Sequence, residues 1–224
     1  NDGWGGGRSV RGNYSGPVAG GKLEATARYG VNDWKEWQEL SSPTAFRRSA
    51  YAEESHSSEV GLTYTRPLAP KWNLETRVIH SMENFDNVST GDETLSGVKS
   101  AQQRFVADGD DSESIARGLV RFEQSKALTI EAGGEVAYNM LDVKQAYSVG
   151  GVAVPLPSAS VKVEELRGEA FTKVTWRVAP KLTLEGGLRA EKSTIKQSGD
   201  ASNEKSFFYL NPRFLATWTP KANN

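Results

Sequence analysis

The sequence predicts an all-β chain, an antiparallel up-and-down meander of about nine long strands that is part of a large transmembrane β-barrel. Three observations predict this fold class. A short turn recurs along the chain, the segments beside it alternate apolar and polar residues, and short turns alternate with long polar connections. A repeated hairpin is the unit from which such a sheet is built.

The recurring turn is clearest at 70–75 and 180–185, which read Pro-Lys-Trp-Asn-Leu-Glu and Pro-Lys-Leu-Thr-Leu-Glu. A further copy begins at 220, and looser copies occupy 21–24 and 125–131. The lysines of successive copies lie 40 to 55 residues apart. This near-regular period indicates one kind of hairpin used several times.

Alternation gives each predicted strand an apolar face and a charged face. In one strand, Leu184, Gly186 and Leu188 alternate with Glu185 and Arg189. Several strands exceed a dozen residues, whereas globular strands have about 5–6 and a membrane-spanning strand needs about 9–11. Length therefore favours a barrel wall over a sandwich. The expected strands are 4–16, 22–34, 57–67, 72–85, 114–124, 127–142, 162–178, 181–195 and 206–219.

The connections between these strands are of two kinds. Tight turns are expected at 17–21, 67–71, 179–181 and 219–221. Long polar loops are expected at 35–56, 86–113, 143–161 and 196–205. Short turns at one end and long loops at the other are typical of outer-membrane barrels, in which the turns face the periplasm. Pro212 lies inside the last strand, where it indicates a strand end or a bulge.

Aromatic residues gather near the ends of the predicted strands, and we expect them to form the two girdles that mark a membrane interface. The turn-end girdle comprises Tyr64, Trp72, Phe122, Trp176 and Trp218. The opposite girdle comprises Tyr29, Trp34, Tyr138 and Phe208. The alternative is that these residues are core aromatics of a soluble sandwich.

Composition narrows the function. The 27 Lys and Arg residues nearly balance 28 Asp and Glu residues, so no nucleic-acid partner is expected. There is no cysteine, and two histidines leave little for metal or acid–base chemistry. The mean hydropathy of −0.55 fits a barrel as well as a soluble protein, because spanning strands alternate. The chain starts without Met or a signal peptide and stops inside a copy of the turn, so we expect residues 1–224 to be a single partial barrel segment truncated at both ends.

Two motifs invite a chemical reading. The glycine-rich start, 3–7, lacks the spacing of a phosphate loop, and a glycine-rich strand or turn is the better interpretation. The acidic group at Asp108, Asp110, Asp111 and Glu113 departs from the register of a calcium-binding loop, so a solvated acidic loop is favoured. No cofactor or metal site is expected, and no catalytic residue.

The charged faces supply the candidate site residues. Carboxylates and arginines on one side of the sheet are expected to form cross-strand ion pairs in a wet lumen; a glycosidase-like carboxylate pair is the alternative. The candidate lumen-facing residues are Arg117, Arg121, Glu131, Glu135, Arg177, Glu185, Arg189 and Arg213.

Two stretches carry a family resemblance. Residues 211–220 read Asn-Pro-Arg-Phe-Leu-Ala-Thr-Trp-Thr-Pro, and 180–189 read Pro-Lys-Leu-Thr-Leu-Glu-Gly-Gly-Leu-Arg. Both resemble strands and hairpins of the barrel domain of TonB-dependent outer-membrane receptors. That family's barrel has about 22 strands and is preceded by an N-terminal plug. This chain has no plug-like stretch, so the resemblance implies that it is an internal piece of the barrel without the plug domain.

The resemblance also implies a function. Such a receptor sits in the Gram-negative outer membrane, contacts its lipid, and imports a small ligand such as a siderophore, driven through the full-length protein by the TonB complex. It binds and transports, and it is not an enzyme. The alternatives are another outer-membrane barrel, such as a porin or secretion pore, and a soluble β-sandwich that binds carbohydrate or another ligand.

Overall fold

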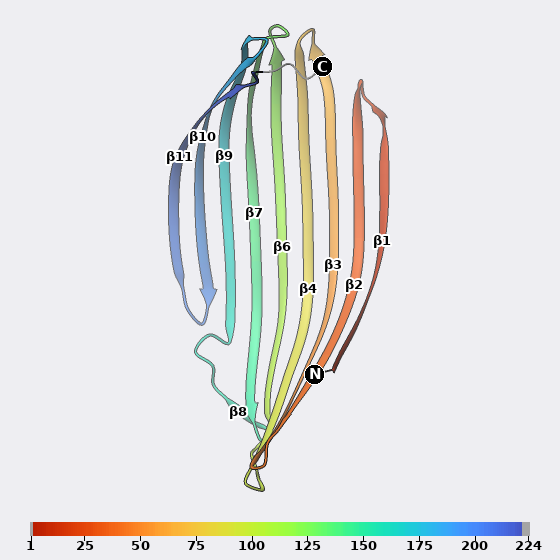
Figure 1. Ribbon diagram of the computed structural model, residues 1–224, viewed down its shortest axis with the longest axis vertical. Coiled ribbons are helices and arrows are strands. Elements are labelled where there is room, and N and C mark those ends of the chain that lie inside the picture. The colour runs from red at the N-terminus through yellow and green to blue at the C-terminus, as the bar shows by residue number, and fades with distance from the viewer. Residues whose placement is uncertain (1, 221–224) are drawn as a thin grey trace.

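The chain folds into one curved antiparallel sheet (Figure 1). The computed structural model describes residues 2–220. Neighbouring strands follow the order β1-β2-β3-β4-β6-β7-β9-β10-β11, and two short strands attach to this path, β5 to β4 and β8 to β7. The strands are β1 (Asp2–Val18), β2 (Gly21–Ser41), β3 (Ala45–Ala69), β4 (Trp72–Leu95), β5 (Val98–Lys99), β6 (Gln103–Glu123), β7 (Leu128–Val149), β8 (Val152–Val154), β9 (Ser160–Ala179), β10 (Leu182–Gly199) and β11 (Asn203–Trp218).

The all-β meander and its long strands are confirmed, but the predicted long loops are wrong. The strands continue through most of these segments, so that only 42–44 separates β2 from β3 and only 200–202 separates β10 from β11. The other two connections contain β5 and β8. In these extensions both faces are rich in polar residues, so alternation fades from the sequence while the backbone ladder continues.

The tight turns lie together at one end of the sheet, here called the turn end. Residues 19–20, 70–71, 124–127 and 180–181 connect successive long strands there. Ala19, Gly20 and Lys71 have φ values of 47°, 78° and 71°, the left-handed geometry of a tight turn. Part of the turn expected at 219–221, and Lys221 in the copy that begins at Pro220, lie outside the described residues.

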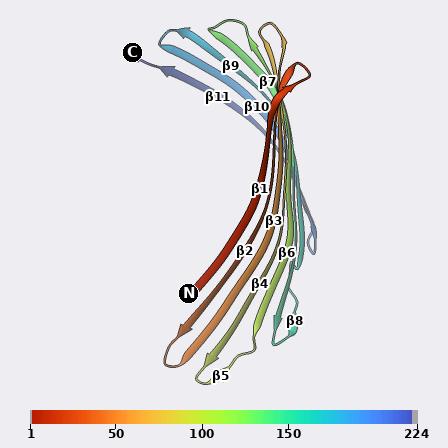
Figure 2. The ribbon, with the colours of Figure 1, turned by 90° about the vertical axis from the view of Figure 1, so that its right-hand side faces the viewer.

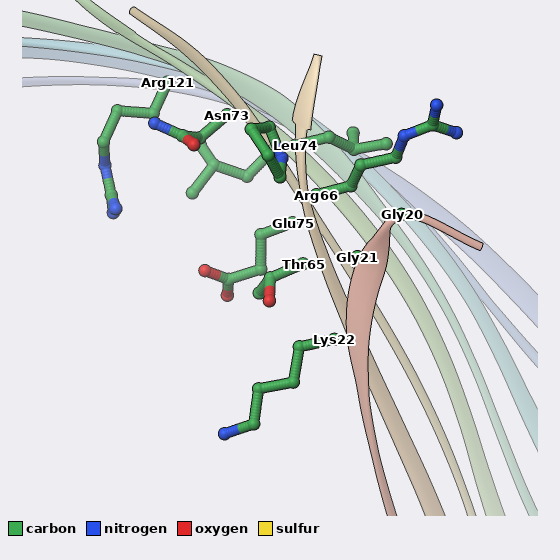
Figure 3. A pocket seen from close by; sticks show the side chains of 11 residues that line it. Gly20, Gly21, Lys22, Thr65, Arg66, Asn73, Leu74, Glu75 and Arg121 are labelled. Carbon is green, nitrogen blue, oxygen red and sulfur yellow. The ribbon is translucent and has the colours of Figure 1, made fainter. Parts of the chain in front are cut away.

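The two faces of the sheet differ in chemistry. Directly paired residues share a face, so the row Ala25, Leu62, Val78, Ala116 and Val136 runs along one side of five strands. Figure 2 shows the curvature of the strands in profile. We call the inner side the concave face and the outer side the convex face. Figure 3 shows Lys22, Glu75 and Arg121 on the concave side, and Arg66 and Leu74 on the convex side.

The sheet is a single layer with two open edges. Within residues 2–220, β1 and β11 each pair with one neighbour, and the only buried apolar side chains are Ala107, Leu119 and Ala137. Large apolar side chains stay exposed on the convex face, among them Val136, Leu166 and Phe214. A sandwich would need a second layer over this face, so the sandwich alternative is wrong for this structure. Residues 2–220 include no helix suited to crossing a membrane.

Pro212 causes neither a strand end nor a bulge, so that expectation is wrong. It pairs with Leu188 in a ladder that runs unbroken from Leu182–Trp218 to Gln197–Asn203. Because β11 is an edge strand, a missing N–H that faces away from β10 costs this ladder nothing.

Candidate functional site

The convex face carries an apolar band between two aromatic levels. Eight of the nine predicted girdle residues lie on this face: Tyr29, Tyr64, Trp72, Phe122, Tyr138, Trp176, Phe208 and Trp218. At the turn end the rings of Trp72 and Phe122 stack with centroids 4.4 Å apart. Trp34 is the exception, and its assignment to the girdle is wrong. It follows Tyr29 by five residues, an odd number, and so lies on the concave face beside Gly5.

The height of the band can be read along β11. Phe208 and Trp218 are ten residues apart on the same face. At about 3.4 Å per residue they are about 34 Å apart along the strand. A tilt of about 40° leaves about 26 Å of height, close to the apolar band of about 25 Å in outer-membrane barrels.

The concave face carries a ladder of ion pairs across β6, β7, β9 and β10. At its turn-end side Glu131 accepts from two cations: Arg121 Nε lies 2.7 Å from its Oε1, and Lys173 Nζ lies 2.7 Å from its Oε2. Direct pairing places Glu131 between Arg121 and Lys173 in one row. The Glu131 side chain is only 13% exposed, so the two cations compensate a sheltered carboxylate.

The next rows repeat this arrangement. Glu135 lies between Arg117, at 3.6 Å, and Arg167, at 3.5 Å. One step farther along the sheet, Arg189 bridges Glu169 at 3.4 Å and Glu191 at 3.3 Å. Glu131, Glu135 and Glu169 thus each have a cation from a neighbouring strand, and these ion pairs join β6, β7, β9 and β10 across the concave face.

Phe171 is an apolar residue within this polar ladder. Its ring packs against Gly133, where an added Cβ would meet Phe171 Cζ at 2.7 Å. The Arg117 guanidinium lies over the same ring, 4.6 Å from its centroid. The glycine therefore makes room for an aromatic ring that supports Arg117, a contact that local sequence patterns do not reveal.

Five of the eight candidate site residues belong to the ladder: Arg117, Arg121, Glu131, Glu135 and Arg189. The other three are on the same face but form no salt bridge within residues 2–220. Arg177 donates to the Lys126 carbonyl at the turn end, with Nη1 3.3 Å from the oxygen. Glu185 and Arg213 line a shallow pocket of about 330 Å³ that also includes Phe171 and Lys173.

The site also includes Arg167, Glu169 and Lys173, which were not among the candidates. They occupy odd-numbered positions of β9, as does the candidate Arg177, so extending the alternation back along this strand from Arg177 would have found them. A second pocket of about 410 Å³ lies near the turn end and includes Lys22, Glu75 and Arg121 (Figure 3).

The acidic group of β6 is divided between the two faces of the sheet. Asp108 and Asp110 lie on the convex face, whereas Asp111 and Glu113 lie on the concave face. Within residues 2–220 no cluster of His, Asp or Glu is suited to holding a metal ion. The glycine-rich start is strand β1, as favoured above.

Beyond the apolar band, Tyr51 on β3 donates a hydrogen bond to Glu53. Burial and, to a lesser degree, this hydrogen bond raise the pKa of Tyr51 to about 12. The hydroxyl therefore stays protonated at neutral pH and remains a donor.

A one-layer sheet with an apolar outer band and a charge-paired inner face defines the wall of an outer-membrane β-barrel. The family of TonB-dependent receptor-like β-barrels matches residues 1–223, and the chain belongs to it. This confirms the resemblance noted in the sequence. The members are receptors and transporters of the Gram-negative outer membrane. A comparison with curated protein sequences finds no match.

Solved structures share the fold at low identity. The ferric-catecholate import receptor Fiu of E. coli K12 aligns with a TM-score of 0.62 and 8% identity, covering 97% of this chain and 44% of Fiu. The pyoverdine receptor FpvA of Pseudomonas aeruginosa PAO1 gives 0.59 and 10%, covering 98% and 43%. The copper transporter OprC gives 0.55 and 10%, covering 94% and 40%. The chain thus spans less than half the length of these proteins.

Proposed function

We propose that this chain is part of the barrel wall of a TonB-dependent receptor that binds a scarce small ligand, such as a ferric siderophore, and imports it across the outer membrane. Its partners are outer-membrane lipid on the convex face, the ligand on the concave side, and the TonB complex through the full-length protein. The opposite chemistry of the two faces is the observation that carries this proposal.

The candidate residues line the lumen in this proposal. The ion-pair ladder around Glu131 and Glu135 supports a wet interior, because paired charges on a barrel wall are stable where water and neighbouring strands surround them. Glu185 and Arg213 form no salt bridge among residues 2–220, so they are the more available of the candidates for a ligand, and they share a pocket with Phe171.

The two open edges support a larger closed wall. An exposed edge presents a row of unpaired backbone groups, which barrels remove by closure. We therefore propose that β1 and β11 pair with further strands of a longer protein, and that residues 1–224 are a single partial barrel segment.

The proposed cargo is a metal chelate. The solved structures that share this fold include a ferric-catecholate import receptor, a pyoverdine receptor and a copper transporter, all of which handle metals or metal chelates. A porin or secretion pore is the second candidate. A receptor and a porin both have an apolar outer band, but only uptake through the receptor requires energy from the TonB complex.

The test is uptake by cells that carry the full-length gene. In a strain lacking it, uptake of an iron-55-labelled siderophore panel and growth under iron limitation are compared with the complemented strain, with and without TonB. The proposal expects uptake of at least one chelate that needs both the gene and TonB. Gene-dependent uptake that persists without TonB would favour a porin, and no gene-dependent uptake of any chelate would contradict the cargo class.

A further inference from the structure

The turn end is more basic than the rest of the molecule. The segments at this end are residues 17–24, 64–75, 121–129, 177–183 and 217–220. These segments contain seven Lys or Arg residues and three Glu residues, an excess of four positive charges, whereas the whole chain has a net charge of −1. Nearly balanced overall charge therefore conceals a basic rim at one end of the sheet.

Most of the cations of this rim lack a carboxylate partner. Lys22 pairs with Glu24 at 2.5 Å, and Arg121 pairs with Glu131. Within the part of the chain that the structure describes, the other five form no salt bridge. They are Arg66, Lys71, Lys126, Arg177 and Lys181. Their charge is therefore available to a partner outside the sheet.

Hydrogen bonds hold several of these cations along the rim. Lys71 Nζ donates to the Gln124 carbonyl at 2.7 Å, which ties one turn to the next. Lys181 Nζ donates to the Pro220 carbonyl at 3.1 Å in the same way. An ammonium group has three donors, so each lysine keeps two for another acceptor. The rim is thus a row of positioned cations rather than a set of free side chains.

The rim lies next to the aromatic level of the apolar band. Lys71 directly precedes Trp72, and Lys181 lies in the turn that follows Trp176 by a few residues. Trp72 and Trp176 are 42% and 50% exposed on the convex face. Arg66 projects to the same side (Figure 3). In a membrane, aromatic residues at this level mark the headgroup region, where lipid phosphates lie.

We propose that the turn-end cations bind the phosphates of phospholipid headgroups in the periplasmic leaflet. The inference rests on the proposed membrane location and goes beyond ligand uptake. Charge complementarity and continuity with the apolar band carry it: a phospholipid places its acyl chains against the band and its phosphate at the rim. Each lysine near an anionic membrane surface contributes roughly a fivefold gain in affinity.

The test uses the purified full-length receptor in detergent micelles and measures binding of phosphatidylglycerol by native mass spectrometry. The variant K71Q/K126Q/K181Q is compared with K144Q/K162Q/K196Q, which removes three lysines of β7, β9 and β10 from the opposite end of the sheet, here called the loop end. We expect the turn-end variant to bind about 100-fold more weakly and the loop-end variant to bind like wild type. The variant K71R/K126R/K181R keeps the charge and should retain binding.

Two outcomes would overturn the inference: unchanged affinity for phosphatidylglycerol in the turn-end variant, or an equal loss of affinity in the loop-end variant. If the glutamine variant does not fold, the salt dependence of lipid binding by the wild-type receptor still tests the inference. Lipid affinity that is unchanged between about 0.1 and 1 M salt would contradict binding to the headgroup phosphate. If the turn-end variant keeps its lipid binding but no longer crosslinks to a periplasmic protein that the wild type crosslinks to, the rim binds that protein instead.

Failure of the proposed function is seen separately. A receptor that never assembles in the outer membrane as a heat-modifiable barrel contradicts the membrane location. An assembled receptor whose lipid affinity ignores these lysines contradicts only the headgroup inference.

Discussion

Replacing Leu188 with arginine tests the assignment of the two faces. Leu188 is 44% exposed on the convex face of β10 and pairs with Pro212. Pro212 lies four residues from Phe208 and six from Trp218, or about 14 Å and 20 Å along the strand. Leu188 is therefore near the middle of the apolar band.

Arginine on the lipid face costs about 2–4 kcal/mol at the midplane and about 0–1 near the interfaces. Leu188→Arg should therefore lower the equilibrium constant for folding into lipid vesicles by roughly 30-fold or more, since every 1.4 kcal/mol is tenfold. Leu184→Arg should cost about 1 kcal/mol at most, because Leu184 pairs with Ala216, only two residues from Trp218.

Thr175→Arg is the matched control on the other face. Thr175 is on the concave face and pairs with Glu185, which can accept from the new guanidinium. The full-length receptor carrying each substitution is folded into vesicles over a urea series, and folded protein is scored as the heat-modifiable band. If Thr175→Arg lowers folding stability as much as Leu188→Arg, the assigned faces are refuted. If Leu184→Arg lowers it more than Leu188→Arg, the assigned depths are refuted.

Three further expectations concern packing, charge and solubility. Glu131→Gln leaves Arg121 and Lys173 without their carboxylate and should lower the free energy of unfolding, measured by urea titration, by about 1–3 kcal/mol. The control Glu185→Gln breaks no salt bridge among the described residues and should change this free energy by less than about 0.5 kcal/mol. Equal urea midpoints for the two variants would show that the ion-pair ladder contributes no stability. Gly133→Ala should destabilise by about 1–3 kcal/mol because its Cβ meets the Gly118 carbonyl and Phe171. Gly118→Ala should be tolerated, because nothing lies within 4 Å of its added Cβ. A larger loss of stability for Gly118→Ala than for Gly133→Ala in the urea titration would contradict the packing described for Phe171. The 224-residue chain alone, in buffer without detergent, should aggregate through its open edges and convex face; a monodisperse species of 24.4 kDa in ultracentrifugation would argue against a membrane wall.

Local sequence patterns predicted the fold class because they report on single strands. The alternation of Leu184 and Leu188 with Glu185 and Arg189 depends only on the twofold period of a strand. The same period gives the face of each candidate residue. The repeated turns showed that consecutive strands are antiparallel neighbours. These features, and the family, could be recognised before any pairing was known.

Strand ends and partners could not be predicted in this way. The loop-end halves of β3 and β4 are polar on both faces, so the sequence there looks like loop, and only the pairing of the two strands shows that each continues for more than twenty residues. Trp34 was assigned to a girdle from its distance along the chain, while the parity of its position places it on the concave face.

Charge was visible in the sequence, but its compensation was not. Which side of each strand is charged follows from the order of residues alone, because it depends on neighbours in the chain. The pairing of strands places Glu131 between Arg121 and Lys173, and it leaves Lys71 and Lys181 without a carboxylate partner among the described residues. The physical reason is the register: ion pairs join residues on different strands, and pairing across the sheet sets which side chains meet.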